Sequence, residues 1–155
     1  DDPREMIDLM ATIDDPQLAG QVATRAAHSW ARTDPAAAAA WAGSLAQDKT
    51  RSDAVAQVAQ VWSRQEPAAA RSWVLGLGRG LPRDAAITSY LAASASPDAE
   101  VLSAYSSDNA RQLGVQQTVF RLARQDPEAA RQLIDDYLTD PTLRQRAEQA
   151  LAASR

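Results

Sequence analysis

The sequence predicts an all-α fold of five stacked helical hairpins, and three observations support this prediction. Alanine and leucine dominate the 45% of residues that are hydrophobic, and alanine is the strongest helix former but a poor strand former. A short segment recurs along the chain every 30 to 32 residues. Every proline can be placed at the start of a helix. The 155 residues are therefore predicted to form a single repeat domain with about ten helices.

The repeat is clearest in two segments, WARTDPAAAAAW at residues 30–41 and WSRQEPAAARSW at residues 62–73. Prolines mark the same phase in all five units, at intervals of 30 or 32 residues: Pro3, Pro35, Pro67, Pro97 and Pro127. Repeats of this length are typical of stacked supersecondary units. The predicted units cover approximately residues 2–33, 34–65, 66–95, 96–125 and 126–155.

The first helix of each unit is predicted to begin at this proline and to run for about 10 to 12 residues. Proline is tolerated there because its missing N–H would have no helical partner anyway. The residue before the proline can cap the free amide groups. The predicted caps are Asp2, Asp34, the weaker Glu66, Ser96 and Asp126, and Asp2 with Glu5 makes a capping box.

The second helix of each unit is expected to follow a short turn and to span about 13 to 16 residues. Pro16, Pro82 and Pro141 can begin such helices, with Asp15 and Asp140 as caps. The turns are predicted at residues 46–50, 76–81 and 106–109. Apolar residues recur at helical spacing on one face of two of these helices: Ala54, Val58, Val61 and Trp62, then Val115, Val119 and Leu122. A single hairpin cannot bury such a stripe, so neighbouring hairpins must stack.

Composition and charge exclude several classes of function. The net charge is -4 and the chain has no basic run, so nucleic-acid binding is not expected. The longest apolar stretches are too short to insert into a bilayer, and the acidic first residues do not form a signal peptide. Cysteine is absent, which fits either the cytoplasm or the periplasm. The high content of alanine and arginine suggests a GC-rich bacterial genome.

The chain resembles the tetratricopeptide repeat family, whose helical hairpins recur about every 34 residues. That family has a proline near the end of each unit and an apolar residue, often tryptophan, six positions later. Trp41 follows Pro35 and Trp73 follows Pro67 at this spacing, and the D-P-x-x-A pattern is similar. The resemblance covers nearly the whole chain and implies a short right-handed α-solenoid, or superhelix. The shortened units leave a HEAT-like or other α/α stack as the alternative.

The resemblance also implies that a protein segment binds along the surface of the first helices. The residues four and seven positions after each unit proline would line this surface, which is mostly small and apolar with two guanidinium groups. Such a surface suits a protein or peptide segment with apolar anchors and a carboxylate. The predicted partner-binding residues are Ile7, Met10, Arg71, Val74, Arg131 and Ile134. The alternative is that Arg71 and Arg131 are solvated, or paired within the acidic surface.

The remaining motifs have structural interpretations. GLGRG at residues 76–80 is expected to end a helix, because no strand precedes it as in a phosphate-binding loop. Asp135 and Asp136 are expected on a solvated face. His28 is the only histidine, so it lacks the companions that a catalytic triad or a histidine metal site needs. No catalytic residue, cofactor or metal site is predicted.

Four tryptophans occupy repeat-equivalent positions in the second and third units or directly before them: Trp30, Trp41, Trp62 and Trp73. Tryptophan is enriched in binding hot spots, so a partner pocket is one interpretation. The equivalent, core-type positions favour the other, a packed aromatic ladder between adjacent hairpins.

The sequence therefore predicts a non-enzymatic protein-interaction scaffold, part of a larger bacterial protein or assembly. One alternative is an accessory superhelical domain of an enzyme, such as a cell-wall lytic enzyme, with its catalytic part outside this chain. Another is a structural subunit that packs through its end faces, with the oligomeric state left open. The last helix is polar enough to cap the array, whereas the first has apolar residues that a neighbour would cover: Met6, Ile7, Leu9, Met10 and Ile13.

Overall fold

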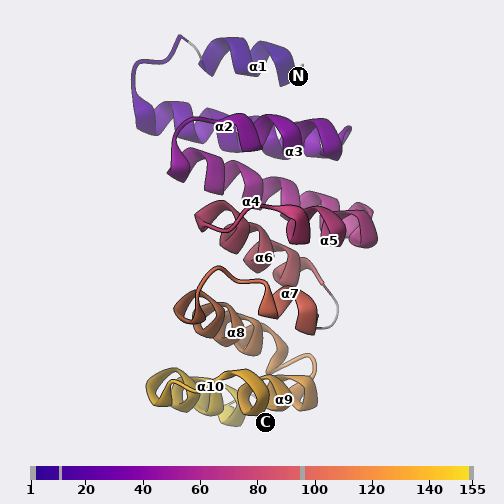
Figure 1. Cartoon of the computed structure of the whole chain (residues 1–155), viewed down its shortest axis with the longest axis vertical. Helices are drawn as coiled ribbons and strands as arrows, with labels where there is room; N and C mark the ends of the chain where they lie inside the picture. The colour runs from indigo at the N-terminus through magenta and orange to yellow at the C-terminus, as the bar shows by residue number, and fades with distance from the viewer. Residues whose placement is uncertain (1–2, 11, 95–96, 154–155) are drawn as a thin grey trace.

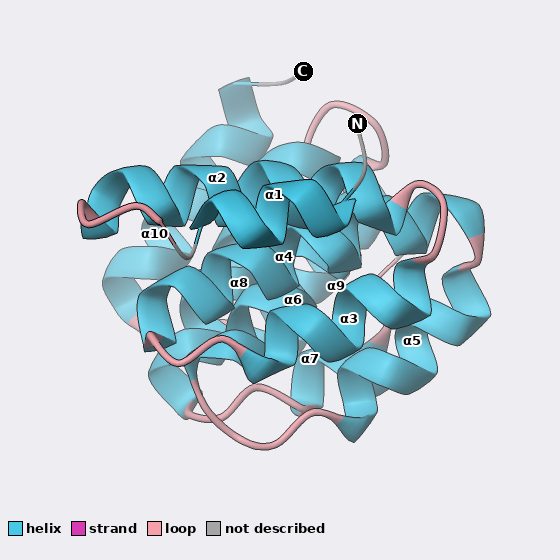
Figure 2. Cartoon of the chain, turned by 90° about the horizontal axis from the view of Figure 1, so that it is seen from above, coloured by secondary structure: helices cyan, strands magenta, loops and turns pink. Residues whose placement is uncertain are grey.

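The described residues, 3–10, 12–94 and 97–153 of a computed structural model, form ten helices and no strand (Figures 1 and 2). The predicted all-α class is therefore confirmed. The first helices of the five hairpins are α1 (Pro3–Met10), α3 (Pro35–Ser44), α5 (Pro67–Gly76), α7 (Ala99–Ser103) and α9 (Pro127–Tyr137). The second helices are α2 (Pro16–Ala31), α4 (Asp48–Gln65), α6 (Leu81–Ala93), α8 (Asp108–Leu122) and α10 (Pro141–Ala153).

The hairpins follow one another along the longest axis of the molecule, with α1 and α2 at one end and α9 and α10 at the other (Figure 1). The second helices pack on one another in sequence, and the contact between α4 and α6 is the most extensive. From α3 onward, each first helix packs against the second helices before and after it. The turns that lead into the second helices lie along one side of the stack, on the left in Figure 1.

Aspartate caps begin four of the helices as predicted. The N–H groups of Gln17, Ala37 and Ala129 donate to Asp15, Asp34 and Asp126 over 2.8, 2.9 and 3.0 Å. Asp140 accepts from Thr142 and Leu143, both at 2.9 Å, while Glu66 makes no side-chain cap. Asp2 and its capping box lie outside the described residues. Proline is the first residue of six helices and the second residue of α6.

The fourth hairpin departs from the prediction. Its first helix has five residues, fewer than expected, and begins at Ala99 rather than at Pro97. The physical reason is that Asp98 provides the cap, accepting from the N–H groups of Glu100 and Val101 at 3.1 Å. The predicted cap Ser96 lies outside the described residues. Helix α4 is longer than expected, with 18 residues, because it begins at Asp48 inside the predicted turn.

The core consists largely of alanine and valine on the inner faces of the helices. The predicted stripes are buried, since Val58, Val115 and Val119 are 0% exposed, and Trp62 packs against this core while half-buried. Alanine at many positions lets the helices approach closely. The stack therefore has a continuous core that runs through neighbouring hairpins, as stacked repeats require.

The four tryptophans form two separate pairs instead of a continuous ladder. The rings of Trp30 and Trp41 have centroids 6.0 Å apart at 41°, and those of Trp62 and Trp73 have centroids 5.5 Å apart at 37°. Each pair joins the second helix of one hairpin to the first helix of the next. All four rings are half-buried against the core, which agrees with the packing interpretation.

Side chains also reach from one second helix to the end of the second helix before it. Gln65 Nε2 donates to the carbonyl of Arg32, at the end of α2, over 3.1 Å. Arg121 Nη2 on α8 donates to the carbonyl of Leu91 in the last turn of α6 over 2.9 Å. These bonds satisfy carbonyl groups that the end of a helix leaves without an intrahelical partner.

Among the described residues, no helix is both long and apolar enough to span a membrane.

Candidate interaction surface

The structure corrects the predicted surface along the first helices. Val74 is 0% exposed and Ile134 is 2% exposed, so neither side chain can contact a partner. Both residues are the seventh after a unit proline, on first helices that each pack against two second helices. Ile7 is half-buried on α1. The side chain of Met10 lies outside the described part of the structure.

The predicted guanidinium group on α5 is already paired within the chain. Arg71 Nε lies 2.6 Å from Asp98 Oδ2, and Arg71 Nη2 lies 2.5 Å from Glu100 Oε2. The hydrogen bonds to Asp98 and Glu100 raise the pKa of Arg71 above its ordinary value. Burial opposes ionisation of Asp98, but the hydrogen bonds from Arg71, Val101 and Glu100 outweigh burial and lower the pKa of Asp98. Arg71 therefore links α5 to α7, as in the alternative interpretation.

Arg131 remains exposed on α9, far along the stack from Arg71. It lines a cavity of about 250 Å³ between α9 and α10, together with Asp135 and Arg144. Arg144 Nη2 lies 2.6 Å from Asp135, and Arg144 Nη1 also donates to the carbonyl of Ile134 over 3.2 Å. The six predicted residues thus do not combine into one groove.

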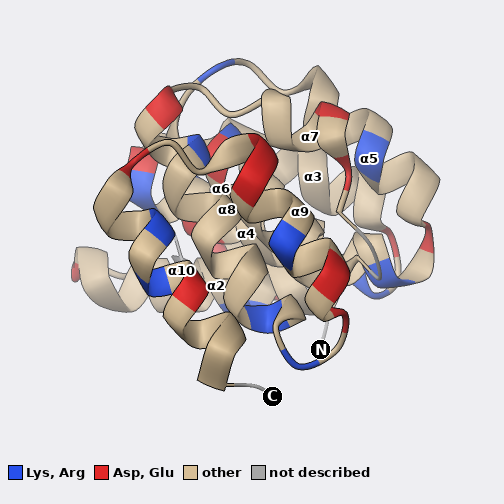
Figure 3. Ribbon diagram, turned by 90° about the horizontal axis from the view of Figure 1, so that it is seen from below, with Lys and Arg blue, Asp and Glu red and all other residues tan. Residues whose placement is uncertain are grey.

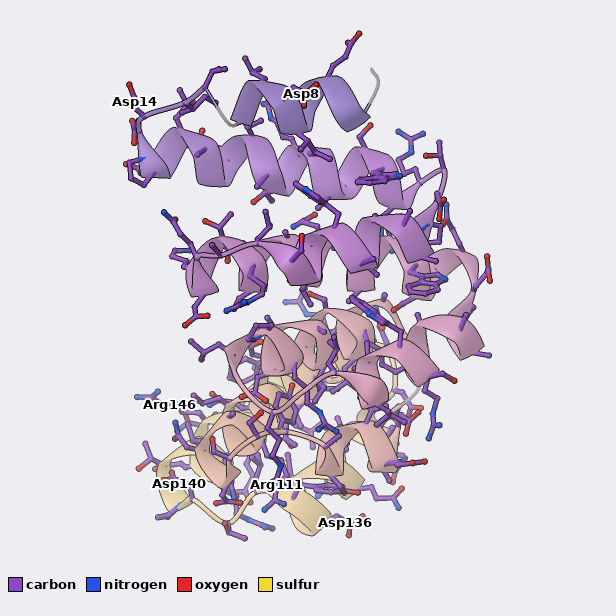
Figure 4. The ribbon with its side chains drawn as sticks, turned by 45° about the horizontal axis from the view of Figure 1, so that its top comes forward. Asp8, Asp14, Arg111, Asp136, Asp140 and Arg146 are labelled. Carbon is purple, nitrogen blue, oxygen red and sulfur yellow. The ribbon has the colours of Figure 1, made fainter. Side chains whose placement is uncertain are left out.

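The other motifs behave as structural elements. His28 is exposed on α2, and Asp135 and Asp136 are exposed on α9; Figure 4 labels Asp136 at the periphery. GLGRG contains the end of α5 and the turn into α6, where Gly80 has a φ of 143° that favours glycine. Within the described part of the chain, no three His, Cys, Asp or Glu residues gather where they could hold a metal ion.

Among the described residues, three of the five large apolar side chains that are exposed lie on α6 and α8, and the other two are Leu9 on α1 and Leu18 on α2. Leu81 at the start of α6 is 67% exposed, and Leu113 and Phe120 on α8 are 42% and 46% exposed. The exposed positions of α2 and α4 are mostly polar, as at Gln21 and Asp53. Isolated exposed leucines are common, but a contiguous group marks an interaction surface. We call Leu81, Ala85, Leu113, Gln117 and Phe120 the α6–α8 surface.

A groove of about 590 Å³ crosses the first turns of α4 and α6 and the adjoining part of α8, and it contains most of this surface. Leu81, Ala85 and Leu113 line it, and Asp48, Lys49 and Asp84 supply its charged groups. Asp48 pairs with Arg51, and Lys49 Nζ lies 2.7 Å from Asp53 Oδ2. The charged groups of the groove are thus largely paired within the chain. The rest of its lining is mainly apolar.

The floor of the groove is a buried tyrosine. Tyr105 is 5% exposed, and its hydroxyl lies 3.0 Å from Thr88 Oγ1 on α6. Burial raises the pKa of Tyr105 to about 12. A Cβ atom at Gly114 would lie 2.0 Å from Tyr105 Oη and 2.4 Å from Cζ, so only glycine leaves room for this ring on α8.

The turns beside the groove are tied together. The N–H of Gly80 donates to Ser106 Oγ over 2.7 Å, and the N–H of Ser106 donates to Asp84 Oδ1 over 2.7 Å. These bonds join the turn before α6 to the turn before α8. The walls that α6 and α8 contribute to the groove are therefore tied to each other within the chain.

Charges of both signs are interspersed on the face seen in Figure 3. Asp140 and Arg146 on the last hairpin, and Arg111 on α8, illustrate this mixture in Figure 4. Such a surface offers no large field of one sign to steer a charged ligand.

Comparison of the chain with protein-family models, with curated proteins and with solved structures found no match.

Sequence reasoning missed the α6–α8 surface although α8 carries a signal for it. At 100° per residue, Leu113 and Phe120 lie 20° apart and between 100° and 160° from Val115 and Val119. A helix with apolar residues on two separate faces presents one of them to a partner or to solvent. The core stripe was recognised, and the second face was not.

Proposed function

We propose that this chain is a protein-interaction scaffold that holds a partner polypeptide on the α6–α8 surface. The observation that carries the proposal is the group of exposed apolar side chains, Leu81, Leu113 and Phe120, beside a preformed groove. Apolar anchors on a rigid helical surface are the usual means by which such surfaces bind a helix or an extended segment.

We infer further that the hairpins form a short right-handed superhelix of the tetratricopeptide-like type within a larger bacterial protein or assembly. This inference is supported by the regular spacing of the unit prolines and by the first helices that pack between successive second helices. Tryptophan six residues after Pro35 and Pro67 also supports the resemblance to tetratricopeptide repeats. The binding surface then lies on the second helices, in place of the first helices that the resemblance implies.

A specific observation also favours contact through the N-terminal end face. Leu9 on α1 is 54% exposed, and Ile7 and Ile13 near it are half-buried. A structural subunit that packs through this end would bury these side chains. This second candidate predicts that substitutions at Leu9, and not on α6 or α8, abolish partner binding.

The test compares single variants of matched exposure. Wild-type protein and the variants Leu113→Asp, Leu18→Asp and Leu9→Asp are used to capture a partner from bacterial lysate, and the captured protein is then purified and titrated against each variant. Leu18 on α2 is 48% exposed and serves as the matched control for Leu113.

We expect Leu113→Asp to abolish binding and Leu18→Asp to retain it, with circular dichroism confirming that both remain helical. Loss of binding on Leu9→Asp alone would favour the end face. Equal binding by all four proteins would contradict both candidates.

A further inference from the structure

We propose that the partner of the α6–α8 surface is an extended polypeptide segment with two anchors. Its acidic side chain binds Arg25 on α2, and its apolar side chain contacts Leu81 and Leu113. The proposal rests on the proposed function of the same surface and names the chemistry of its occupant. It is argued from a second groove, which adjoins the groove of that surface.

The second groove has a volume of about 700 Å³ and lies between the first half of α2 and the first turns of α4. The two helices approach closely there, because a Cβ atom at Gly20 would lie 3.5 Å from Thr50 Oγ1. Lys49 lines both this groove and the groove of the α6–α8 surface. The two grooves therefore form one path from α2 across the first turn of α4 to α6 and α8, on the side where the second helices begin (Figure 1).

The charged side chains along this path leave one positive charge without a partner. Asp48 and Lys49 form ion pairs with residues one turn further along α4. Asp84 on α6 accepts a hydrogen bond from a backbone N–H. The side chain of Arg25 is exposed in the second groove and pairs with no described residue. A carboxylate is the group that best complements a guanidinium, so the occupant is expected to carry an acidic side chain at this point.

The amide side chains of the second groove favour an extended segment over a helix. Gln17 and Gln21 line the groove, and their exposed amide groups bond to no described residue. Each amide offers both a donor and an acceptor. The backbone N–H and C=O groups of an extended segment need such partners, whereas a helix satisfies most of these groups internally. The second groove thus suits the backbone of an extended segment.

The fold sets the distance between the two anchors. Helices α2, α4 and α6 pack on one another in sequence, and packed helices lie about 8 to 10 Å apart. Arg25 is the tenth residue of α2, whereas Leu81 is the first of α6, which adds an offset of about 14 Å along the helices. The path is therefore about 20 to 25 Å long, and an extended chain covers it with about six to eight residues.

The experiment selects binders from a phage-displayed library of random peptides of about twelve residues, long enough to cover the path. The immobilised proteins are wild type, Arg25→Glu, Leu113→Asp and the control Arg124→Glu. Arg124 is an exposed arginine just after α8 that lines neither groove. Circular dichroism confirms that each variant remains helical.

We expect wild type and Arg124→Glu to select peptides with Asp or Glu about six to eight positions from a large apolar residue. Arg25→Glu should select Lys or Arg in place of the acidic residue, because the charge that faces it is reversed. Leu113→Asp should no longer select the apolar residue. Selection of the same acidic peptides by Arg25→Glu, or of no peptide by wild type, would overturn the proposal.

One selected peptide is then synthesised with both ends blocked and titrated against each protein. Arg25→Glu should weaken its binding at least about tenfold, because a charged hydrogen bond is lost. Arg124→Glu should change the affinity by less than about twofold. Replacing the acidic residue of the peptide with lysine should restore binding to Arg25→Glu. An affinity that requires a free C-terminal carboxylate would overturn the acidic side chain as the bound group.

The outcomes also separate this proposal from the broader one. If the selected peptides bind Arg25→Glu as tightly as wild type but do not bind Leu113→Asp, the α6–α8 surface is an interaction surface and the acidic occupant is rejected. Peptides whose binding neither substitution changes would reject both proposals.

Discussion

The junctions between the first three hairpins are aromatic, whereas the junctions of the fourth hairpin with its neighbours depend on polar contacts and aliphatic side chains. Trp30 packs on Trp41 and Trp62 packs on Trp73, with centroids 6.0 and 5.5 Å apart. At the positions that correspond to these pairs, the next junction has Ala92 and Ser103, both of which are exposed. The repeat thus keeps its period at this junction, but no tryptophan pair packs there.

Hydrogen bonds between other residues join the third hairpin to the fourth. Tyr105 bonds to Thr88, and Ser106 bonds to both Gly80 and Asp84. The junction with the fifth hairpin uses Gln112, which is 3% exposed and accepts from the N–H of Thr139 over 3.1 Å.

The groove lies at the junction without tryptophans, near the start of α6, whereas Ala92 is in the last turn of that helix. Two tryptophans fill the space between adjacent hairpins with bulky side chains, and their rings leave little surface uncovered. Alanine and serine cannot do this between α6 and α7, and at the same junction α6 and α8 make less contact with each other than α4 and α6 do. Tyr105, Leu81 and Leu113 all line this groove.

The largest expected effect comes from breaking an aromatic junction. Trp62→Ala should lower the free energy of unfolding by about 3 kcal/mol, because it removes a large side chain packed on Trp73 and the core. Phe120→Ala is the matched control at an exposed aromatic and should change stability by less than about 0.5 kcal/mol. Urea denaturation measures both. A loss of similar size in the two variants would mean that the tryptophan pairs do not hold the first hairpins together.

A smaller effect is expected from filling the space for Tyr105 at the polar junction. Gly114→Ala should destabilise by about 1 to 3 kcal/mol, since the new methyl group overlaps the phenol ring. Gly43→Ala is the control, because its added Cβ meets nothing within 4 Å and helix propensity favours alanine. Thermal unfolding of both variants, and of Gly114→Ala combined with Tyr105→Leu, checks the assignment. The smaller leucine should recover part of the stability, and no recovery would argue against the overlap with the ring.

The smallest effect is a pH dependence that belongs to the same junction. In the unfolded chain tyrosine ionises near pH 10, whereas burial raises the pKa of Tyr105 in the folded chain to about 12. The stability due to the neutral phenol is therefore complete below pH 10 and is lost as the pH rises towards 12. Tyr105→Phe should cost about 1 kcal/mol at pH 7, from the lost bond to Thr88.

The difference between Tyr105→Phe and wild type should then shrink or reverse between pH 10 and 12, as measured by urea denaturation at several pH values. A constant difference across this range would contradict the raised pKa. The comparison isolates Tyr105, because every other titrating group is common to the two proteins.

The helices that the sequence predicted well are those that local chemistry determines. Asp34 before Pro35 and Asp126 before Pro127 mark helix starts that need no information from distant residues. The fourth hairpin was predicted poorly because Asp98, two positions after Ser96, is the cap that the helix uses. Its carboxylate is also held by Arg71, which lies 27 residues away and has no local signal for this partner.

Two of the predicted partner-binding residues were placed wrongly for a related reason. Val74 and Ile134 were placed on an open face by analogy with a repeat family, and their burial depends on how closely two second helices approach each first helix. Leu113 and Phe120 carried a local signal, because they lie on a separate face from the core stripe of α8. Tyr105 and Gly114 carried none, since their contact joins two elements whose relative position only the folded chain defines.

Two of the second helices receive a hydrogen bond at their C-terminal end from a side chain of the next second helix. Gln65 bonds to Arg32, and Arg121 bonds to Leu91, so in each case the later hairpin donates and the earlier one accepts. During synthesis on the ribosome, α2 cannot gain its cap until α4 has emerged, and α6 must wait for α8. The first and third hairpins are therefore completed only after the second helix of the next hairpin has been made.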